Sequence, residues 1–399
     1  MTVAALARVD ALFPGELRQR LISLRRSIHA EPELAFEEQR TAEKLEHALR
    51  ELGVAVVDRV AGTGVVARVR GRDRTAPVVA VRADIDALPV QEDTGLPFAS
   101  RTKGVMHACG HDVHATWAVG AAALLARQSA AGDVLVVLQP AEETGRGALA
   151  ILATGVLDDV HAIFGGHVDR RFEVGQVVAA EGPLAASADT FQIELAGQGA
   201  HAARPHEAAD PIVGLAALVT ALQTIVSRRL DPAVPGVVTV ATVQAGTAAN
   251  VIPASALLTG TVRAVEPRSR QLMLDEVRRI AESVASAHRL TARVALDAGT
   301  PPIVNPPRAA AWAREAARTL LGEANVVPLG FVNLAGEDFA HYMERFPGCF
   351  LRIGAREAGG AMIPAHAPSF HAAEGSIFVG AAVLAESARV ASAALVAGN

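Results

Sequence analysis

Cysteine, lysine and aromatic residues are scarce in this sequence. Two cysteines, Cys109 and Cys349, are too few for a disulfide framework and favour a reducing compartment. Phenylalanine, tyrosine and tryptophan together make up 4% of the chain, which leaves few rings on which the bases of a single-stranded nucleic acid could stack. The only lysines are Lys44 and Lys103, and the net charge is −5. Because no basic field covers the chain, we do not expect a nucleic acid as partner.

The sequence also offers little that would suit a membrane. Its longest uncharged run, residues 233–262, is rich in valine and threonine and is broken by proline and glycine, which favours β-strands over a membrane-spanning helix. The first residues include Arg8 and Asp10 and lack the apolar core of a signal peptide. We therefore expect a cytoplasmic protein without a membrane partner.

Apolar residues are plentiful, at 51% of the chain. That is enough for large cores, and the length of 399 residues suggests about two domains. Helical periodicity predicts two helices within the first 52 residues and another over 114–127. Continuous apolar runs lie between and after them at 65–69, 77–85, 132–140 and 161–168. Such runs are typical of strands covered on both faces, so the sequence predicts an α/β domain.

The middle of the chain has a different pattern. Residues 190–196 alternate apolar and polar side chains, which predicts a strand with one exposed face. Asp210-Pro211 predicts the start of a helix that reaches about Arg229. A further helix and three strands complete the order β-α-β-β-α-β, which is that of a ferredoxin-like domain. We expect this small domain as an insertion in a larger one, with boundaries at 186–298 for the insertion and 1–185 and 299–399 for the larger domain.

Side chains that bind metals follow several of the expected strands. His107, Cys109, His111 and His114 lie in one loop, Glu142 and Glu143 follow the next strand, His167 ends another, and His366 and His371 lie near the C-terminus. In open α/β sheets, ligands bind where loops leave the carboxyl ends of the strands. A mixture of imidazole, carboxylate and one thiolate suits zinc or a similar divalent ion. The candidates are numerous enough for two metals.

The adjacent pair Glu142-Glu143 indicates a division of roles. Neighbouring side chains on an irregular loop point in different directions, so one carboxylate could bind a metal while the other reaches a water. A metal lowers the pKa of a bound water toward about 7. The second glutamate could then accept the proton and pass it to a leaving amine.

Seven motifs resemble those of the dinuclear metal amidohydrolases of the aminoacylase, hippurate hydrolase and indole-acetyl-amino-acid hydrolase type, the amidohydrolase subfamily of the peptidase M20 family. They occur in the order of that family and span most of the chain: VRADIDALPVQE (81–92), HACGHDVHAT (107–116), QPAEETGRGA (139–148), GQGAHAARPHEAADPI (197–212), NVIP (250–253), GTVR (260–263) and GEDFA (336–340). The resemblance implies a mixed-sheet, metallopeptidase-like catalytic domain of the α/β class with an inserted ferredoxin-like lid domain.

The resemblance also implies roles for individual residues of the larger domain. Cys109 matches the ligand that bridges two metals, Glu142 matches the general base, and Asp84 matches a carboxylate that orients the ligands. The other implied metal ligands are His111, Glu143, His167 and His366. His371 falls where the family usually has another residue, and is the weaker candidate. Zinc is the metal we expect first, with manganese, cobalt and nickel as alternatives.

In the small domain, His201, Asn250 and Arg263 match positions that contact the substrate or the developing oxyanion. A guanidinium suits a carboxylate, and an imidazole or an amide can stabilise an oxyanion. We expect a homodimer or higher homo-oligomer, because small domains of this type often extend a sheet edge across a two-fold axis. His201 could serve its own active site or that of a neighbour.

The segment around His167 departs from the family pattern. The family usually has a bulky residue before this histidine and a proline soon after it, whereas this chain has Gly166 and then Asp169, Arg170 and Arg171. This departure concerns the substrate pocket more than the metal site. We expect both arginines to be solvated.

The sequence therefore predicts a metal-dependent amidohydrolase that cleaves N-acyl amino acids into a carboxylic acid and a free amino acid. One alternative is a dipeptidase or aminopeptidase with the same site, which would need an acidic group to bind the free amine of its substrate. The other is a non-catalytic relative that carries a metal or ligand. A panel of acetylated, benzoylated and free dipeptide substrates separates the first two, and metal analysis with a turnover assay tests the third.

Overall fold

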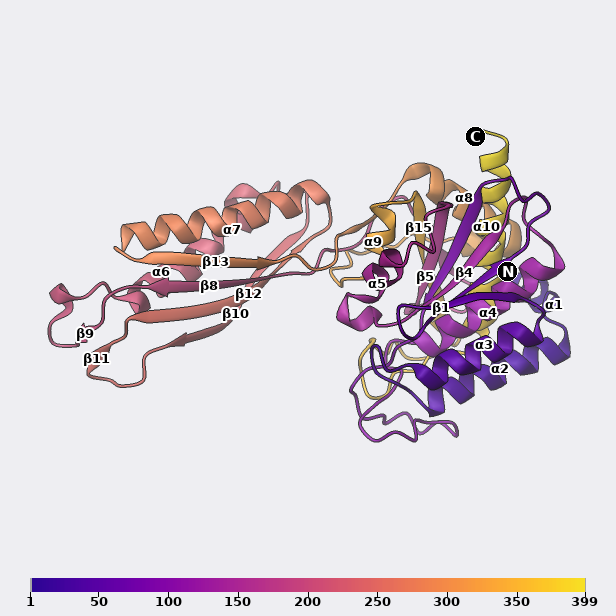
Figure 1. Ribbon diagram of the computed structural model, residues 1–399, viewed down its shortest axis with the longest axis horizontal. Coiled ribbons are helices and arrows are strands. Elements are labelled where there is room, and N and C mark those ends of the chain that lie inside the picture. Colours follow the sequence, from indigo (N-terminus) through magenta and orange to yellow (C-terminus); the bar gives the residue numbers. More distant parts are fainter. Residues whose placement is uncertain (1, 399) are drawn as a thin grey trace. The chain divides into compact units, whose positions relative to one another are not determined.

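The computed structural model describes residues 2–398, the side chains of 2–5 and 55–57 excepted. It divides into two compact units. Unit 1 comprises Met1–Gly182, Asn305–Gly330 and Asp338–Asn399, and unit 2 comprises Pro183–Val304 and Phe331–Glu337. Unit 2 is thus an insertion in the sequence of unit 1, and Figure 1 shows it as the magenta-to-orange segment.

Unit 1 is built on a seven-stranded mixed sheet with the strand order β1-β2-β4-β3-β5-β15-β6. Strands β3, β4, β5 and β15 are parallel to one another, whereas β1, β2 and β6 pair antiparallel. The bounds are β1 Ala55–Val60, β2 Gly64–Val69, β3 Val78–Asp84, β4 Val134–Gln139, β5 Val160–Glu173, β6 Val177–Val178 and β15 Gly348–Arg356. The carboxyl ends of the four parallel strands therefore meet at one edge of the sheet.

Helices cover both faces of this sheet, as its continuous apolar strands predict. Every residue of β3 and of β4 is buried. Helices α3, α4, α8 and α10 share one apolar core with the sheet. On the other face, Phe339, which precedes α9, packs its ring 4.9 Å from that of Phe350 on β15, and α9 contacts α5. The helices of unit 1 are α1 Thr2–Ala11, α2 Gly15–Ala30, α3 Gln39–Glu51, α4 His111–Arg127, α5 Gly147–Ala153, α8 Pro307–Leu321, α9 Ala340–Met343 and α10 Gly375–Val396, with single turns η1 Glu142–Thr144 and η4 Glu323–Asn325.

Helix α10 is the one described helix whose length and hydropathy would also suit a membrane span, and 61% of its most apolar window is buried inside the structure. It packs against α4, α8 and the central strands β3 and β5. At Gly380, a Cβ atom would lie 2.3 Å from the ring of Trp117 on α4, so the two helices approach as closely as a glycine permits. These contacts are those of a core helix.

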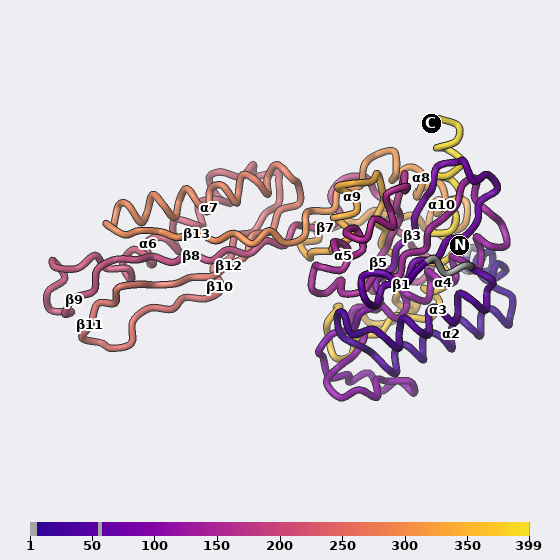
Figure 2. Tube along the Cα trace, in the orientation of Figure 1, coloured from indigo at the N-terminus to yellow at the C-terminus, as the bar shows by residue number. Residues whose placement is uncertain are grey.

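Unit 2 contains a four-stranded antiparallel sheet of order β10-β12-β8-β13, with α6 and α7 packed on one face (Figures 1 and 2). Along β8, buried and more exposed residues alternate, so one face meets the helices and the other is open. Its elements are β8 Asp189–Ala196, α6 Pro211–Leu222, β10 Gly236–Ala245, β12 Ser255–Ala264, α7 Pro267–Ala287 and β13 Thr291–Asp297, with short β9 Ala200–His201, η2 Pro205–Glu207 and β11 Val251–Ile252. A separate apolar core lies between the helices and the sheet.

The first helix of unit 2 differs from the expectation. Helix α6 begins at Pro211, with the Asp210 side chain accepting the backbone N–H of Ile212 at 2.8 Å, but it ends at Leu222 rather than at Arg229. A wider π-helical turn, η3, follows at Ile225–Arg229 and closes with a hydrogen bond from the Leu230 N–H to the Ile225 carbonyl. The short strands β7 Gly182–Ala185 and β14 Ile303–Asn305 pair with each other where the chain passes between the units.

Candidate metal centre

The residues with metal-binding side chains in unit 1 lie at the carboxyl-terminal edge of its parallel strands. Asp84 is the last residue of β3, the Glu142-Glu143 pair follows β4, and His167 lies on β5. His111 is the first residue of α4, and Cys109 lies two residues before it. Gly110 between them has a φ of 89°, and a Cβ at this position would lie 2.5 Å from Val168. Only glycine is compatible with both constraints, so the turn before α4 delivers Cys109 and His111 to the strand edge.

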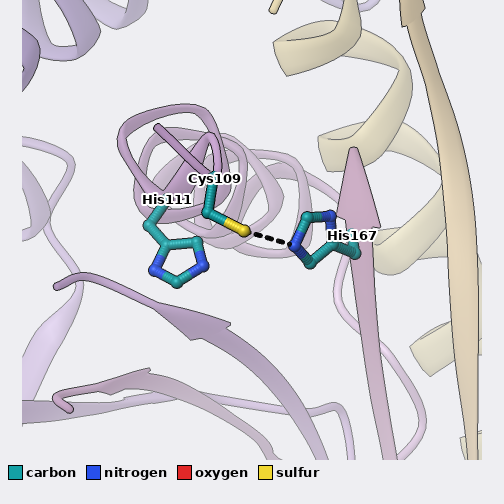
Figure 3. Close-up of side chains that lie close together, drawn as sticks. All are labelled: Cys109, His111 and His167. Carbon is teal, nitrogen blue, oxygen red and sulfur yellow. Dashed lines mark hydrogen bonds between the residues drawn. The ribbon is translucent and has the colours of Figure 1, made fainter. Parts of the chain in front are cut away.

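Five side chains predicted as metal ligands converge here. The Cys109 Sγ lies 3.1 Å from the His167 Nε2, and His111 lies beside them (Figure 3). Cys109 also forms a second group with Glu143 and His366, and within each group the ligand atoms lie within 4.8 Å of one another. The His366 Nε2 is 3.5 Å from the Glu143 Oε1. Cys109 is the residue common to the two groups.

Two atoms of this cluster have chemistry that a cation would satisfy. The His111 Nε2 and the Glu143 Oε1 are buried, have no hydrogen-bond partner among the described residues, and lie 3.9 Å apart. A buried polar atom without a partner is costly, by about 1–3 kcal/mol. Nitrogen, oxygen and sulfur donors at one point are a suitable donor set for zinc and similar divalent ions. The residues therefore fit a metal centre.

Burial and charge shift the protonation of these ligands. Burial, together with the neighbouring Glu143 carboxylate, raises the pKa of the Cys109 thiol well above its usual value. Burial lowers the pKa of His167 well below its usual value, and the adjacent His114 ring lowers it further. Without a cation, Cys109 thus favours the neutral thiol and His167 the neutral imidazole. A metal ion that binds Cys109 as a thiolate must displace its proton.

Asp86 orients two of the candidate ligands, and the sequence did not identify it. The His111 Nδ1 lies 3.0 Å from the Asp86 carbonyl and 3.2 Å from its Oδ1, while the Asp86 Oδ2 accepts the backbone N–H of Glu143 at 3.0 Å. These contacts leave the His111 Nε2 facing the cluster. The signal was present in the motif VRADIDALPVQE, where Asp86 follows Asp84 by two residues.

Asp84 is buried beside the cluster, with partners on both of its oxygens. Its Oδ1 lies 2.6 Å from the His114 Nδ1, and its Oδ2 accepts a hydrogen bond from Arg82 at 2.6 Å. The His114 Nε2 accepts the backbone N–H of Val168 at 3.0 Å, so the ring proton lies on Nδ1 and is donated to Asp84. Burial raises the pKa of Asp84, but the nearby His111, His114 and Arg82 outweigh it and hold the pKa well below the usual value. Asp84 is therefore a carboxylate that fixes the tautomer of His114.

Glu142 lies at the rim of the same cluster. Its Oε2 is 3.9 Å from the His111 Nε2, and its Oε1 accepts the backbone N–H of Asp338 at 3.4 Å. The Asp338 carboxylate accepts hydrogen bonds from Arg82, Gln139 and the backbone of Ala148. Asp338 belongs to the motif GEDFA, and it ties the segments before and after Glu142 to the sheet.

The three residues predicted to contact substrate lie in unit 2, and the structure separates them. His201 on β9 pairs with Val251 on β11, and the Asn250 carbonyl accepts the N–H of Ala202 at 3.0 Å. His201 and Asn250 are therefore neighbours. The strand pair β9-β11 is separate from the four-stranded sheet, and β11 leads into the amino end of β12. Arg263 lies near the carboxyl end of β12, where it pairs with Val237.

Three further residues that the sequence singled out in unit 1 are His371, Arg170 and Arg171. His371 lies apart from the cluster, with its Nε2 3.6 Å from the Glu357 Oε1. The expectation that both arginines after His167 are solvated is wrong for Arg170, whose side chain is 3% exposed, and correct for Arg171, at 44%. Arg170 is buried because backbone carbonyls and a carboxylate surround its guanidinium, which a hydropathy pattern cannot reveal.

Comparisons with known proteins agree with this geometry. A model of peptidase family M20/M25/M40 matches residues 80–389. The N-acetyl-L-cysteine deacetylase of Bacillus subtilis is 40% identical over 341 residues, which cover 85% of this chain and 81% of that protein. The IAA-amino acid hydrolase ILR1-like 5 of Arabidopsis thaliana is 39% identical over 372 residues, covering 92% and 85%. The crystal structure of the Bacillus subtilis YXEP protein, a dinuclear metal binding peptidase from the M20 family, superposes with a TM-score of 0.83 at 37% identity, covering 94% and 98%.

Proposed function

Because the chain belongs to peptidase family M20/M25/M40, we propose that it hydrolyses the amide bond of N-acyl amino acids to a carboxylic acid and a free amino acid. The observation that carries this proposal is the convergence of five ligand-type side chains beside Glu142. Relatives named as a deacetylase of an N-acetyl amino acid and as an amino acid hydrolase support the substrate class.

We assign the two side-chain groups to two divalent cations that share Cys109. One group is Cys109 with His111 and His167, and the other is Cys109 with Glu143 and His366. Cations bound there would polarise the amide carbonyl and make water more acidic. Zinc is our first choice, with manganese, cobalt and nickel as alternatives, because all four accept such donors. We place the enzyme in the cytoplasm, where reducing conditions protect the free thiol of Cys109.

Glu142 is the proton carrier in this proposal. Its carboxylate lies beside His111 without belonging to either of the two groups assigned to cations. It accepts a proton from the attacking water and delivers that proton to the leaving amine. Asp84 acts indirectly: by holding the tautomer of His114, it fixes the packing against His167, whose ring centroid lies 4.7 Å from that of His114.

For unit 2 we propose a ferredoxin-like lid that supplies His201, Asn250 and Arg263 to the substrate. Its order of strands and helices supports the assignment. Arg263 suits the substrate carboxylate, and His201 with Asn250 suits the oxyanion. Because the strand pair with His201 adjoins the amino end of β12 whereas Arg263 lies near its carboxyl end, we propose a homodimer in which His201 serves the neighbouring copy. Mixing a Glu142→Ala variant with a His201→Ala variant restores activity if that is correct.

The test of the proposed function is Glu142→Ala, assayed on acetylated, benzoylated and free dipeptide substrates with cations added. We expect hydrolysis of the acylated amino acids to fall by roughly 10²–10⁴-fold, since proton transfer is the step removed. Metal analysis should find the same cation content as in the wild type. Glu37→Ala, at an exposed glutamate, is the control that leaves activity unchanged.

Full activity of Glu142→Ala with cations bound would contradict the mechanism. Preference of the wild type for dipeptides with a free amine over all acylated substrates would instead assign the chain to the peptidase alternative.

A further inference from the structure

Arg170 is a buried arginine three residues beyond His167 on β5. Its guanidinium donates hydrogen bonds to the carbonyl of His371 at 2.7 Å, to the carbonyl of Ala361 at 3.0 Å, and to the Glu357 Oε2 at 2.9 Å. A longer contact of 3.5 Å reaches the Ala355 carbonyl. Every acceptor belongs to the chain between residues 355 and 371.

That same segment carries His366, the candidate ligand nearest the C-terminus. After β15 ends at Arg356, the chain has no helix or strand until α10 begins at Gly375. His366 itself has a positive φ of 69°, and its side chain is 54% exposed. A residue other than glycine rarely adopts this backbone conformation unless its surroundings impose it. The position of the imidazole therefore depends on contacts that hold the segment.

The contacts of Arg170 lie on both sides of His366. Ala361 precedes His366 by five residues and His371 follows it by five. Within this span, the His366 N–H donates to the carbonyl of Ala108 at 2.8 Å, directly beside Cys109. Thus one guanidinium on β5 holds the two ends of the segment, while its middle is attached next to the bridging cysteine.

We propose that Arg170 is a positioning residue that holds segment 357–371 so that His366 reaches the cation shared with Cys109 and Glu143. The proposal rests on the proposed function, because it assumes that these side chains bind cations. A guanidinium is suited to this role because its rigid planar fork donates in several directions at once, which the ammonium of a lysine cannot do. The Glu357 carboxylate balances the buried charge.

The neighbouring Arg171 provides a matched comparison. Its guanidinium pairs with Asp169, at 2.7 Å for the Nη2–Oδ2 distance, and its side chain is 44% exposed. The two arginines are adjacent and equal in charge, but only Arg170 is buried against the segment that carries His366. Replacing either one by methionine removes the same charge and keeps a long side chain.

The experiment measures zinc binding to chelator-treated wild type, Arg170→Met and Arg171→Met by calorimetry. We expect the wild type and Arg171→Met to bind two cations. Arg170→Met should bind one cation with unchanged affinity and the other at least about tenfold more weakly, since loss of an orienting partner typically costs 10–100-fold in metal affinity. Amide hydrogen exchange of residues 361–371 should be faster in Arg170→Met. A general loss of structure would weaken the binding of both cations. A loss of affinity for one cation alone therefore identifies a positioning role.

The inference would be overturned if Arg170→Met bound both cations with the affinities of the wild type. It would also be overturned if the affinities for both cations fell equally. Absence of zinc binding by the wild type would overturn the proposed function instead. Glu357→Ala covers the case in which Arg170→Met does not fold, because this glutamate is half-exposed and supplies one acceptor only. Glu357→Ala should weaken the binding of the same single cation as Arg170→Met. Unchanged binding of both cations would count against the role of Arg170.

Discussion

At the scale of single residues, the candidate ligand His111 depends on an aspartate that does not belong to the proposed ligand set. Asp86 accepts from the His111 ring with one oxygen and from the Glu143 N–H with the other. In Asp86→Asn, the amide NH₂ would face one of these two donors, so at least one hydrogen bond is lost. We expect zinc affinity to fall by about 10–100-fold, measured by competition with a chromophoric chelator.

The nearby Asp93 is the matched control for this change. Its side chain is exposed, so Asp93→Asn should bind zinc as the wild type does. Equal affinities for Asp86→Asn and the wild type would show that the backbone carbonyl of Asp86, which also lies 3.0 Å from the His111 Nδ1, orients the ring without the carboxylate.

The sequence predicted the residues whose chemistry is visible in their type. Cysteine, histidine and glutamate side chains near successive strand ends are a pattern that indicates metal binding. The structure brings together Cys109, His111, Glu143, His167 and His366. Asp86 and Arg170 were not predicted, because aspartate and arginine occur widely on surfaces. Their importance arises from hydrogen bonds to segments distant in sequence, and only the fold determines those partners.

At the scale of elements, a buried ion pair joins α2 to α4. The Arg25 Nε lies 2.7 Å from the Asp112 Oδ2, and both side chains are 1% exposed. Arg25→Met would leave Asp112 buried without its guanidinium partner, with the His29 ring still beside it at 2.8 Å. We expect a loss of about 3–5 kcal/mol in the free energy of unfolding, measured by the fluorescence of Trp117 and Trp312, both of which lie in unit 1.

The adjacent Arg26 is the control, because its pair with Glu374 is 47% exposed on the arginine side. Arg26→Met should cost no more than about 1 kcal/mol. Equal effects of the two substitutions would refute the claim that burial makes the Arg25–Asp112 pair important.

Acid should weaken the same junction. Burial raises the pKa of Asp112, but Arg25 and His29 outweigh it and hold the pKa far below the usual value. A carboxyl group with a depressed folded-state pKa stabilises the protein above its unfolded pKa of about 3.9 and loses that contribution as the pH falls toward the folded value. The unfolding free energy of the wild type should therefore decrease below about pH 4 more steeply than that of Arg25→Met.

The sequence predicted the elements that have strong apolar periodicity and missed those that depend on polar partners. Strands β2, β3 and β4 lie where continuous apolar runs predicted them. The run that predicted β5 ends at Val168, yet the strand continues to Glu173. It does so because Asp169 and Glu173 pair with Gly354 and Arg356 on β15. Helix α6 ends early because a wider π-helical turn replaces its last turn, a change that the apolar spacing does not reveal.

At the scale of the whole molecule, the insertion of one unit into the other separates two apolar cores. One core contains α2, α4, α8 and α10 with the mixed sheet, and the other lies between α6, α7 and the antiparallel sheet. The change from continuous to alternating apolar patterns near residue 186 is the sequence feature that predicts an insertion, at 186–298. The sequence could not tell how His201 and Arg263 are arranged, because it does not show that β9 and β11 form a strand pair apart from the four-stranded sheet that holds Arg263.

The division into two apolar cores predicts which part of the protein bound cations stabilise. All five candidate ligands belong to unit 1, and a ligand stabilises only the structure whose unfolding releases it. A single cation at 100 times its dissociation constant should raise the unfolding free energy of unit 1 by about 2.7 kcal/mol. Hydrogen exchange with and without zinc should therefore slow in the peptides of β3 and β5 and remain unchanged in those of β8 and β12. Equal protection of both units would mean that the two cores unfold together, whereas protection of unit 2 alone would place the cations outside the cluster around Cys109.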